Sequence, residues 1–167
     1  HMDYGRATRI AASIGRAMAA QNPQAAGILD HLKLQHDGSN VEISIFMSVF
    51  NVHVNRMVQD GKITDVAYHP GKFFSANLDK ASRENEHNAL FVDAPSGQRL
   101  VIVQIAGLIA RRIICGAQAG DTLARGQRFG MICFGSRLDV YLPPDFEIAI
   151  RVGQKVGAGT SILGFLK

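Results

Sequence analysis

Gly135 and Ser136 form the pair of residues in this chain whose types and order most directly suggest chemistry. A glycine lets its carbonyl carbon be approached closely and adopts backbone angles that other residues avoid. A serine hydroxyl that follows it can attack that carbonyl, provided that the fold strains the bond and supplies a base. A Gly-Ser pair is more often a β-bulge or a kink in a strand. Taken alone, the pair therefore favours a structural interpretation.

One histidine and several arginines are the other candidate site residues. His53 lies inside the β-type run from Val41 to Val54, where a histidine is more often a satisfied core residue than a catalyst. Asn55 and Arg56 follow it directly, which favours a polar pocket at this point. The planar, charged guanidinium of arginine recognises phosphates and carboxylates. The candidates for such an anionic group are Arg56, Arg111, Arg112 and Arg137, and a structural ion pair with Asp79, Glu84 or Asp139 is an equal alternative for each.

Composition indicates one folded domain over residues 1–167. The chain is 47% hydrophobic and 19% charged, which is typical of a globular protein rather than a disordered one. Its net charge of +4 suits an anionic partner, but no basic patch is interleaved with aromatic residues, so nucleic acid is not expected. Cys115 and Cys133 lie in apolar runs without metal-ligand spacing, which predicts free thiols and no metal site.

Most of the chain has the pattern of antiparallel β structure. Residues 4–21 form an exception, because their apolar positions recur with a helical period and predict a basic amphipathic helix. A strand run is expected over residues 41–54, with further strands over 62–69, 89–91 and 100–105. Residues 116–126 and 150–159 share a glycine-polar-hydrophobic rhythm of the kind seen in hairpin corners of carrier domains. We therefore predict a mainly β (α+β) fold, an antiparallel β-sandwich or flattened barrel.

Several segments together resemble the phosphatidylserine decarboxylases, in particular their short bacterial and archaeal branch. The resemblance covers roughly residues 41–164, with the matching pieces in the same order. These pieces are Ile43 to Arg56, Leu78 to Ser82 with Glu84-Asn85, Gln104 to Arg112, Arg128 to Gly130, Phe134-Gly-Ser-Arg137, and Asp139 to Pro143.

The resemblance implies a pyruvoyl enzyme that makes its own cofactor by cleaving its chain. In this family the motif serine attacks the preceding glycine carbonyl, and elimination then leaves a pyruvoyl group on the new N-terminus. Carried over, Ser136 is the pyruvoyl precursor, with a β chain of residues 1–135 and an α chain of residues 136–167. The pyruvoyl ketone would accept the electrons left by departing CO₂, and a general acid would return a proton to the substrate carbon.

His53 matches the family's histidine after the long strand, and the resemblance assigns it the proton-handling role. The larger branch of the family has a second histidine three residues later, used in self-cleavage, where this chain has Arg56. His53 is therefore also a candidate processing base. The family's Ala-Asp-Gly turn upstream supplies an aspartate to the processing base, and Ala26 stands in that place here. We interpret Ala26 as an Asp→Ala change, natural or engineered, that impairs cleavage and leaves Ser136 unprocessed.

The resemblance leaves three functional hypotheses. The first is decarboxylation of phosphatidylserine to phosphatidylethanolamine and CO₂ by a peripheral protein on the cytoplasmic face of the cell membrane. An anionic membrane surface and a second copy of the chain, in a homodimer, are its expected partners. The second is the same chemistry on a soluble amino acid, and the third is a non-catalytic β scaffold that never forms pyruvoyl.

Overall fold

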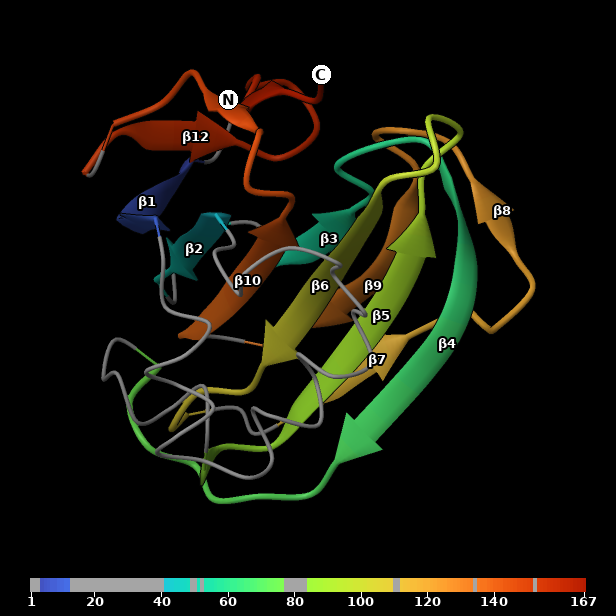
Figure 1. Ribbon diagram of the computed structural model, residues 1–167. Helices are drawn as coiled ribbons and strands as arrows, with labels where there is room; N and C mark the ends of the chain where they lie inside the picture. Colours follow the sequence, from blue (N-terminus) through green and yellow to red (C-terminus); the bar gives the residue numbers. More distant parts are fainter. Residues whose placement is uncertain are drawn as a thin grey trace.

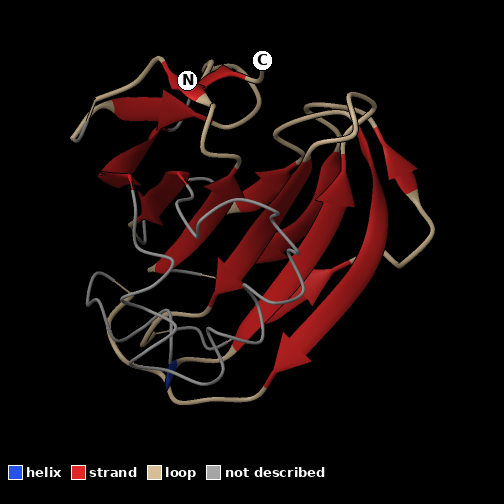
Figure 2. Cartoon of the chain, viewed as in Figure 1, coloured by secondary structure: helices blue, strands red, loops and turns tan. Residues whose placement is uncertain are grey.

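The computed structural model describes residues 4–12, 41–48, 51, 53–76, 84–109, 112–133, 135–151 and 153–167, the first of these ranges as backbone. Figure 2 shows that this part of the chain is almost entirely strand and loop. Its strands are β1 (Tyr4–Ala12), β2 (Val41–Met47), β3 (Val54–Arg56), β4 (Gly61–His69), β5 (His87–Asp93), β6 (Arg99–Ile105), β7 (Ile113–Cys115), β8 (Thr122–Leu123), β9 (Arg128–Ile132), β10 (Ser136–Leu142), β11 (Glu147–Ile148), β12 (Lys155–Gly157) and β13 (Gly164–Phe165).

An eight-stranded sheet forms the body of the molecule (Figure 1). Its strand order is β12-β1-β2-β10-β6-β5-β4-β8, and every pair of neighbours in it is antiparallel. A three-stranded sheet, β3-β9-β7, and a two-stranded sheet, β11-β13, complete the described strands. The predicted mainly antiparallel β architecture is confirmed.

The main core lies between the large sheet and the three-stranded sheet. Side chains alternate between the two faces of a strand, so every second residue of β6 and β10 points toward this core. Ile102 and Val140 come from the large sheet, whereas Phe129 and Ile132 come from β9 of the smaller one. A second, smaller apolar cluster covers the opposite face of β5 and β6 and includes Phe91. Because both faces of β6 are covered, its sequence is almost continuously apolar.

The single strand expected over residues 41–54 is wrong in its extent. The run divides into β2 and β3, which belong to different sheets. Ser48 ends β2, because its backbone N–H and its hydroxyl both donate to Asn51 Oδ1, at 2.8 and 2.9 Å. The backbone N–H of Asn51 donates in return to Ser48 O, at 3.0 Å. These bonds close a turn that a hydrophobic pattern alone does not reveal.

The first part of the expected N-terminal helix also differs in the structure. Residues Tyr4–Ala12 form strand β1, which pairs with β2 on one side and β12 on the other. Alanine, threonine and isoleucine fit either backbone, so pairing to two neighbouring strands decides the outcome over local propensity. Residues 13–21 of the expected helix lie outside the described residues.

Candidate functional site

Ser136 is the first residue of β10, where this strand lies between β2 and β6. It is fully buried, and its register partner on β2 is Met47. Alternation along the strand directs its side chain to the same face as Leu138 and Val140, toward the main core. The remainder of β10 is apolar or internally paired and is hydrogen-bonded on both sides, so the fold holds the serine firmly.

The Gly135–Ser136 peptide has a backbone that only glycine adopts easily. The φ angle of Gly135 is 67°, in the left-handed region. The Gly135 carbonyl also lies directly against the backbone of Gly107, which follows β6. A Cβ placed on Gly107 would overlap Gly135 O and would lie 2.6 Å from Gly135 C and 3.4 Å from Ser136 N. The bond is therefore set by a glycine conformation and by close backbone packing, rather than by an ordinary strand continuation.

The hydroxyl of Ser136 has no hydrogen-bond partner among the described residues. An unpaired buried hydroxyl costs about 1–3 kcal/mol, and such groups in a folded protein call for an explanation in strain or chemistry. A nucleophile awaiting a reaction is one such explanation. The hydroxyl also belongs to the residue that comes directly after the carbonyl carbon it would attack.

His53 lies close to this bond. Its backbone carbonyl accepts a hydrogen bond from the N–H of Ile132, at 3.1 Å, just before the chain turns toward Gly135. Burial lowers the pKa of His53 below its ordinary value of 6.5, and the nearby backbone of Asn51 and of Met47 only partly opposes that shift. Met47 is also the register partner of Ser136, so the ring and the serine lie against the same end of β2. A neutral imidazole there is able to accept a proton.

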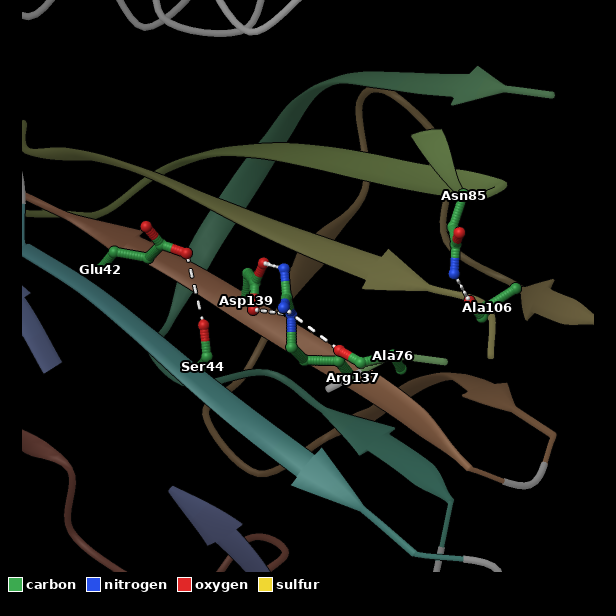
Figure 3. Close-up of polar contacts among 7 residues, drawn as sticks. All are labelled: Glu42, Ser44, Ala76, Asn85, Ala106, Arg137 and Asp139. Atoms are coloured by element: carbon green, nitrogen blue, oxygen red, sulfur yellow. Dashed lines mark hydrogen bonds and ion pairs between the residues drawn. The ribbon is translucent and has the colours of Figure 1, made fainter. Parts of the chain in front are cut away.

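Arg137 points away from the Ser136 side of the sheet and is buried (Figure 3). Two nitrogens of its guanidinium each lie 2.9 Å from an oxygen of the Asp139 carboxylate, and the guanidinium donates a hydrogen bond to Ala76 O at 3.2 Å. The Arg137 side chain therefore forms a structural ion pair rather than an open site for an anion. Figure 3 also shows Glu42 on the neighbouring strand β2, accepting a hydrogen bond from Ser44 at 3.3 Å.

The remaining arginine candidates are not gathered around Ser136. Arg56 donates to Gly126 O at 2.7 Å, and its side chain packs against Gly159. Arg112 is exposed, just before β7, and its carbonyl accepts from the N–H of Cys133 at 3.0 Å. Arg111 and Ala26 lie outside the described residues.

A largely apolar cavity of about 420 Å³ lies along β2 and β10, with neither Ser136 nor His53 in its lining. Met47 and Leu138 line it at the end nearest Ser136, and Phe146 and Leu166 belong to its C-terminal side. Arg56 and Asn55 supply polar groups to the wall. Its volume is in the range of pockets that accept small organic ligands or part of a larger one.

Two buried asparagine contacts escaped sequence reasoning. Asn85 donates to Ala106 O at 2.8 Å and to Phe74 O at 2.7 Å, which fixes the chain directly before Gly107 (Figure 3). Gln104 links Asn88 to Asn55, with bonds of 3.0 and 2.8 Å, and so connects the large sheet to β3 next to His53. Asn55, Asn85 and Gln104 lie in segments that match the family, but the sequence did not show these hydrogen bonds.

His87 is a second buried histidine that the sequence did not single out. Its Nδ1 is 2.8 Å from Asn85 O, and its ring stacks on that of His69, with centroids 4.8 Å apart. Burial lowers the pKa of His87 below 6.5. Its register partner, Ile105, also pairs with Arg137, so its side chain lies on the face of the sheet opposite Ser136. Within the described ranges, no three His, Cys, Asp or Glu side chains are grouped as for a metal ion.

The fold and the site together define a class of protein. It is an antiparallel β protein with a buried serine directly after a left-handed glycine and with a buried histidine near the neighbouring strand end. Serine and histidine are residue types that act as nucleophile and base.

Comparison with known proteins identifies the family. The profile of the phosphatidylserine decarboxylase family matches residues 15–164. Two relatives named phosphatidylserine decarboxylase proenzyme, from Solidesulfovibrio magneticus and Syntrophus aciditrophicus, are 59% and 56% identical over 121 and 123 residues. A third of the same name, from Magnetococcus marinus, is 43% identical over 167 residues. The chain belongs to the phosphatidylserine decarboxylase family.

The extent of these matches differs between the chain and its relatives. The first two alignments cover 72% and 74% of this chain but only 56% and 58% of the relatives. The third covers the whole of this chain and 73% of the relative. The chain thus spans less than two thirds of the length of the first two relatives. No solved structure matches it significantly.

Proposed function

We propose that this chain carries the self-cleaving, pyruvoyl-forming core of a phosphatidylserine decarboxylase, with Gly135–Ser136 as the bond that breaks. One observation carries the proposal: the Ser136 hydroxyl is buried without a described partner, directly after a left-handed Gly135. Family membership and the names of the relatives support it.

Self-cleavage would proceed on the chain's own atoms. Ser136 Oγ attacks Gly135 C, the C–N bond breaks, and an ester joins the two residues while the nitrogen of Ser136 takes up a proton. Loss of the Ser136 Cα proton then breaks the Cβ–Oγ bond and leaves a carboxylate on Gly135 and dehydroalanine at residue 136. Hydrolysis of the enamine releases ammonia and gives the pyruvoyl end of the α chain.

His53 is the base that we assign to the first of these steps. Its lowered pKa keeps the ring neutral near pH 7, so that it can take the proton of Ser136 Oγ. In the family an aspartate supports this base, and Ala26 stands in its place. An alanine cannot orient or stabilise a charged imidazole, so cleavage of this chain should be slow and Ser136 should persist as serine.

The pyruvoyl group would begin the shortened β10, between β2 and β6. When present, it supplies an electron-withdrawing ketone that stabilises the carbanion left by CO₂ loss. His53 would hold the proton that returns to the substrate carbon. The apolar cavity supports a substrate with a large non-polar part, which favours a phospholipid over a soluble amino acid.

Arg112 is the best placed of the three described arginine candidates to meet a phosphate or carboxylate. Arg137 is engaged with Asp139, and Arg56 with a backbone carbonyl. Arg112 is exposed and makes no ion pair with any described residue.

No helix among the described residues is long and apolar enough to cross a membrane. We propose peripheral attachment at the cytoplasmic face of the membrane, and a homodimer as the assembly.

Intact mass and denaturing gels test the proposal on this chain and on Ala26→Asp. We expect this chain to remain whole, and Ala26→Asp to yield fragments 1–135 and 136–167, the second with a blocked, pyruvoyl N-terminus. Ala26→Asp with Ser136→Ala is the matched control and should not cleave. The cleaved protein should then release CO₂ from phosphatidylserine.

Two results would contradict specific parts of this proposal. Two bands from the unaltered chain would refute the impairment attributed to Ala26. An uncleaved Ala26→Asp protein would refute pyruvoyl formation and favour the non-catalytic scaffold.

A further inference from the structure

The turn that follows β6 exposes two large aliphatic side chains next to the scissile bond. Leu108 is 51% exposed and Ile109 is 66% exposed, the second being the highest value for a large hydrophobic residue in the described part of the chain. Exposing adjacent aliphatic side chains to water is unfavourable, and such a pair next to a functional site indicates an interaction surface. Gly107, directly before them, is the residue whose backbone lies against the Gly135 carbonyl.

The base of this turn is rigidly attached to the sheet, so its position relative to Ser136 is fixed. Ala106 donates its N–H to Glu86 O at 2.9 Å, and its own carbonyl accepts from Asn85 at 2.8 Å. Figure 1 shows β6 ending at the same end of the large sheet at which β10 begins. Anything that contacts Leu108 and Ile109 is therefore brought to the end of the sheet at which Ser136 lies.

A cationic group accompanies the apolar pair. Arg112 lies three residues after Ile109, within about 11 Å along even a fully extended chain. It is exposed and forms no ion pair with the residues that the structure describes. Paired aliphatic side chains with an adjacent arginine match the two components of an anionic bilayer, the acyl region and the negative headgroups. The net charge of +4 has the same sign.

We infer that the Leu108–Ile109 turn, with Arg112 beside it, is the surface by which this protein docks on an anionic phospholipid bilayer. The two aliphatic side chains insert at the headgroup boundary while Arg112 contacts lipid phosphates. Docking in this orientation faces the Ser136 end of the sheet toward the membrane, so that a lipid substrate needs to move only a short distance. This inference rests on the proposed lipid substrate and names the surface that meets it.

The opposite end of the sheet provides a matched control. Phe165 is 54% exposed, close to the values of the turn residues. The C-terminal Lys167 accepts a hydrogen bond from Gln98, at 2.7 Å, in the hairpin before β6. Phe165 thus lies at the other end of β6, a strand that is about 20 Å long at 3.3 Å per residue.

The chain contains no tryptophan, so a single introduced tryptophan reports on one position. We would compare Ile109→Trp with Phe165→Trp, using vesicles of phosphatidylcholine and phosphatidylserine that carry brominated acyl chains. Fluorescence of Ile109→Trp should shift to the blue and be quenched, whereas that of Phe165→Trp should not change. Quenching at position 165 alone, at both positions equally, or at neither position would overturn the inference.

Loss of binding provides the second measurement. Leu108→Ser with Ile109→Ser should lower vesicle partitioning about 30-fold, if each half-exposed side chain contributes about 1 kcal/mol on insertion. Phe165→Ser should bind as the unaltered chain does. Added salt should weaken binding through Arg112, and Arg112→Gln should reduce this salt dependence. Equal binding of the double variant and the unaltered chain would refute the docking surface.

Failure of this inference is distinguishable from failure of the proposed function. Cleavage of Ala26→Asp is followed in solution without vesicles, so it reports on the Gly135–Ser136 chemistry alone. A protein that cleaves and decarboxylates but is not quenched at position 109 refutes the docking surface only. A protein that is quenched at position 109 but never cleaves refutes the pyruvoyl mechanism and leaves the docking surface supported.

Discussion

Gly107→Ala is the substitution that most directly tests the geometry assigned to the scissile bond. The added methyl group would overlap Gly135 O and would lie only 2.6 Å from Gly135 C. Non-bonded carbon atoms are normally separated by about 3.5–4.0 Å, so the Gly135–Ser136 peptide must move by at least about 1 Å. The obstructing atoms are backbone atoms at the start of β10, so no side chain can rotate to relieve the contact.

A displacement of this size should affect cleavage much more than folding. Misplacing reacting atoms by 1 Å can lower a rate by about 10²-fold, and we expect a loss of that order in the Ala26→Asp background. Overpacking by one methyl group in a well-packed region costs about 1–3 kcal/mol of stability, which a domain of this size can tolerate. The change should therefore yield a folded and largely uncleaved protein.

The assay combines cleavage, trapping and unfolding measurements. Cleavage is followed on denaturing gels, and hydroxylamine, which splits esters, reports whether the acyl shift has occurred. Gly107→Ala should yield little hydroxylamine-sensitive ester. A defect confined to the steps after the acyl shift would instead leave the ester in place. Urea unfolding shows whether the variant is folded.

Gly116→Ala is the control for the effect of a methyl group on a glycine. Neither Gly107 nor Gly116 has a left-handed backbone, so the backbone angle itself permits alanine at both. A Cβ on Gly116 would have Phe129 O as its nearest neighbour, at 3.7 Å, which is an ordinary contact. Gly116→Ala should cleave at the parent rate. Cleavage of Gly107→Ala within about twofold of the parent would refute the positioning role, because it is far from the expected 10²-fold loss.

Two further predictions concern stability and its dependence on pH. Arg137→Met should destabilise the fold by about 3–5 kcal/mol because it leaves Asp139 buried without its cation, whereas Arg137→Met with Asp139→Leu should lose much less; equal losses in urea unfolding would contradict a tightly coupled pair. Burial lowers the pKa of both His53 and His87, so below about pH 6.5 the unfolded chain binds more protons than the folded one. The free energy of unfolding should therefore fall as the pH decreases from 6.5 through the lowered pKa values, and His87→Gln should flatten that decrease. An unchanged pH slope in His87→Gln, measured by urea unfolding across this range, would show that His87 is not the source.

The sequence by itself determined the class of fold and the bond of interest. Alternating and continuous apolar runs predicted the strands that became β4, β5 and β6, because strand periodicity is a local property of the chain. The resemblance of the motif segments to a known family pointed to Gly135–Ser136 and His53. The family match over residues 15–164 confirms the family, and the roles of these residues stay predictions.

Tertiary structure alone decided how these residues are arranged in space. The sequence could not show that Gly107 touches the Gly135 carbonyl, because this contact depends on the antiparallel pairing of β6 with β10. Nor could it show what surrounds the side chains of Ser136 and Arg137. As adjacent residues of a strand, they lie on opposite faces of the sheet. Side-chain alternation is a local property of a strand. Which face of the strand meets the core, and which side chains pack against that face, depends on strands that lie far apart in the sequence.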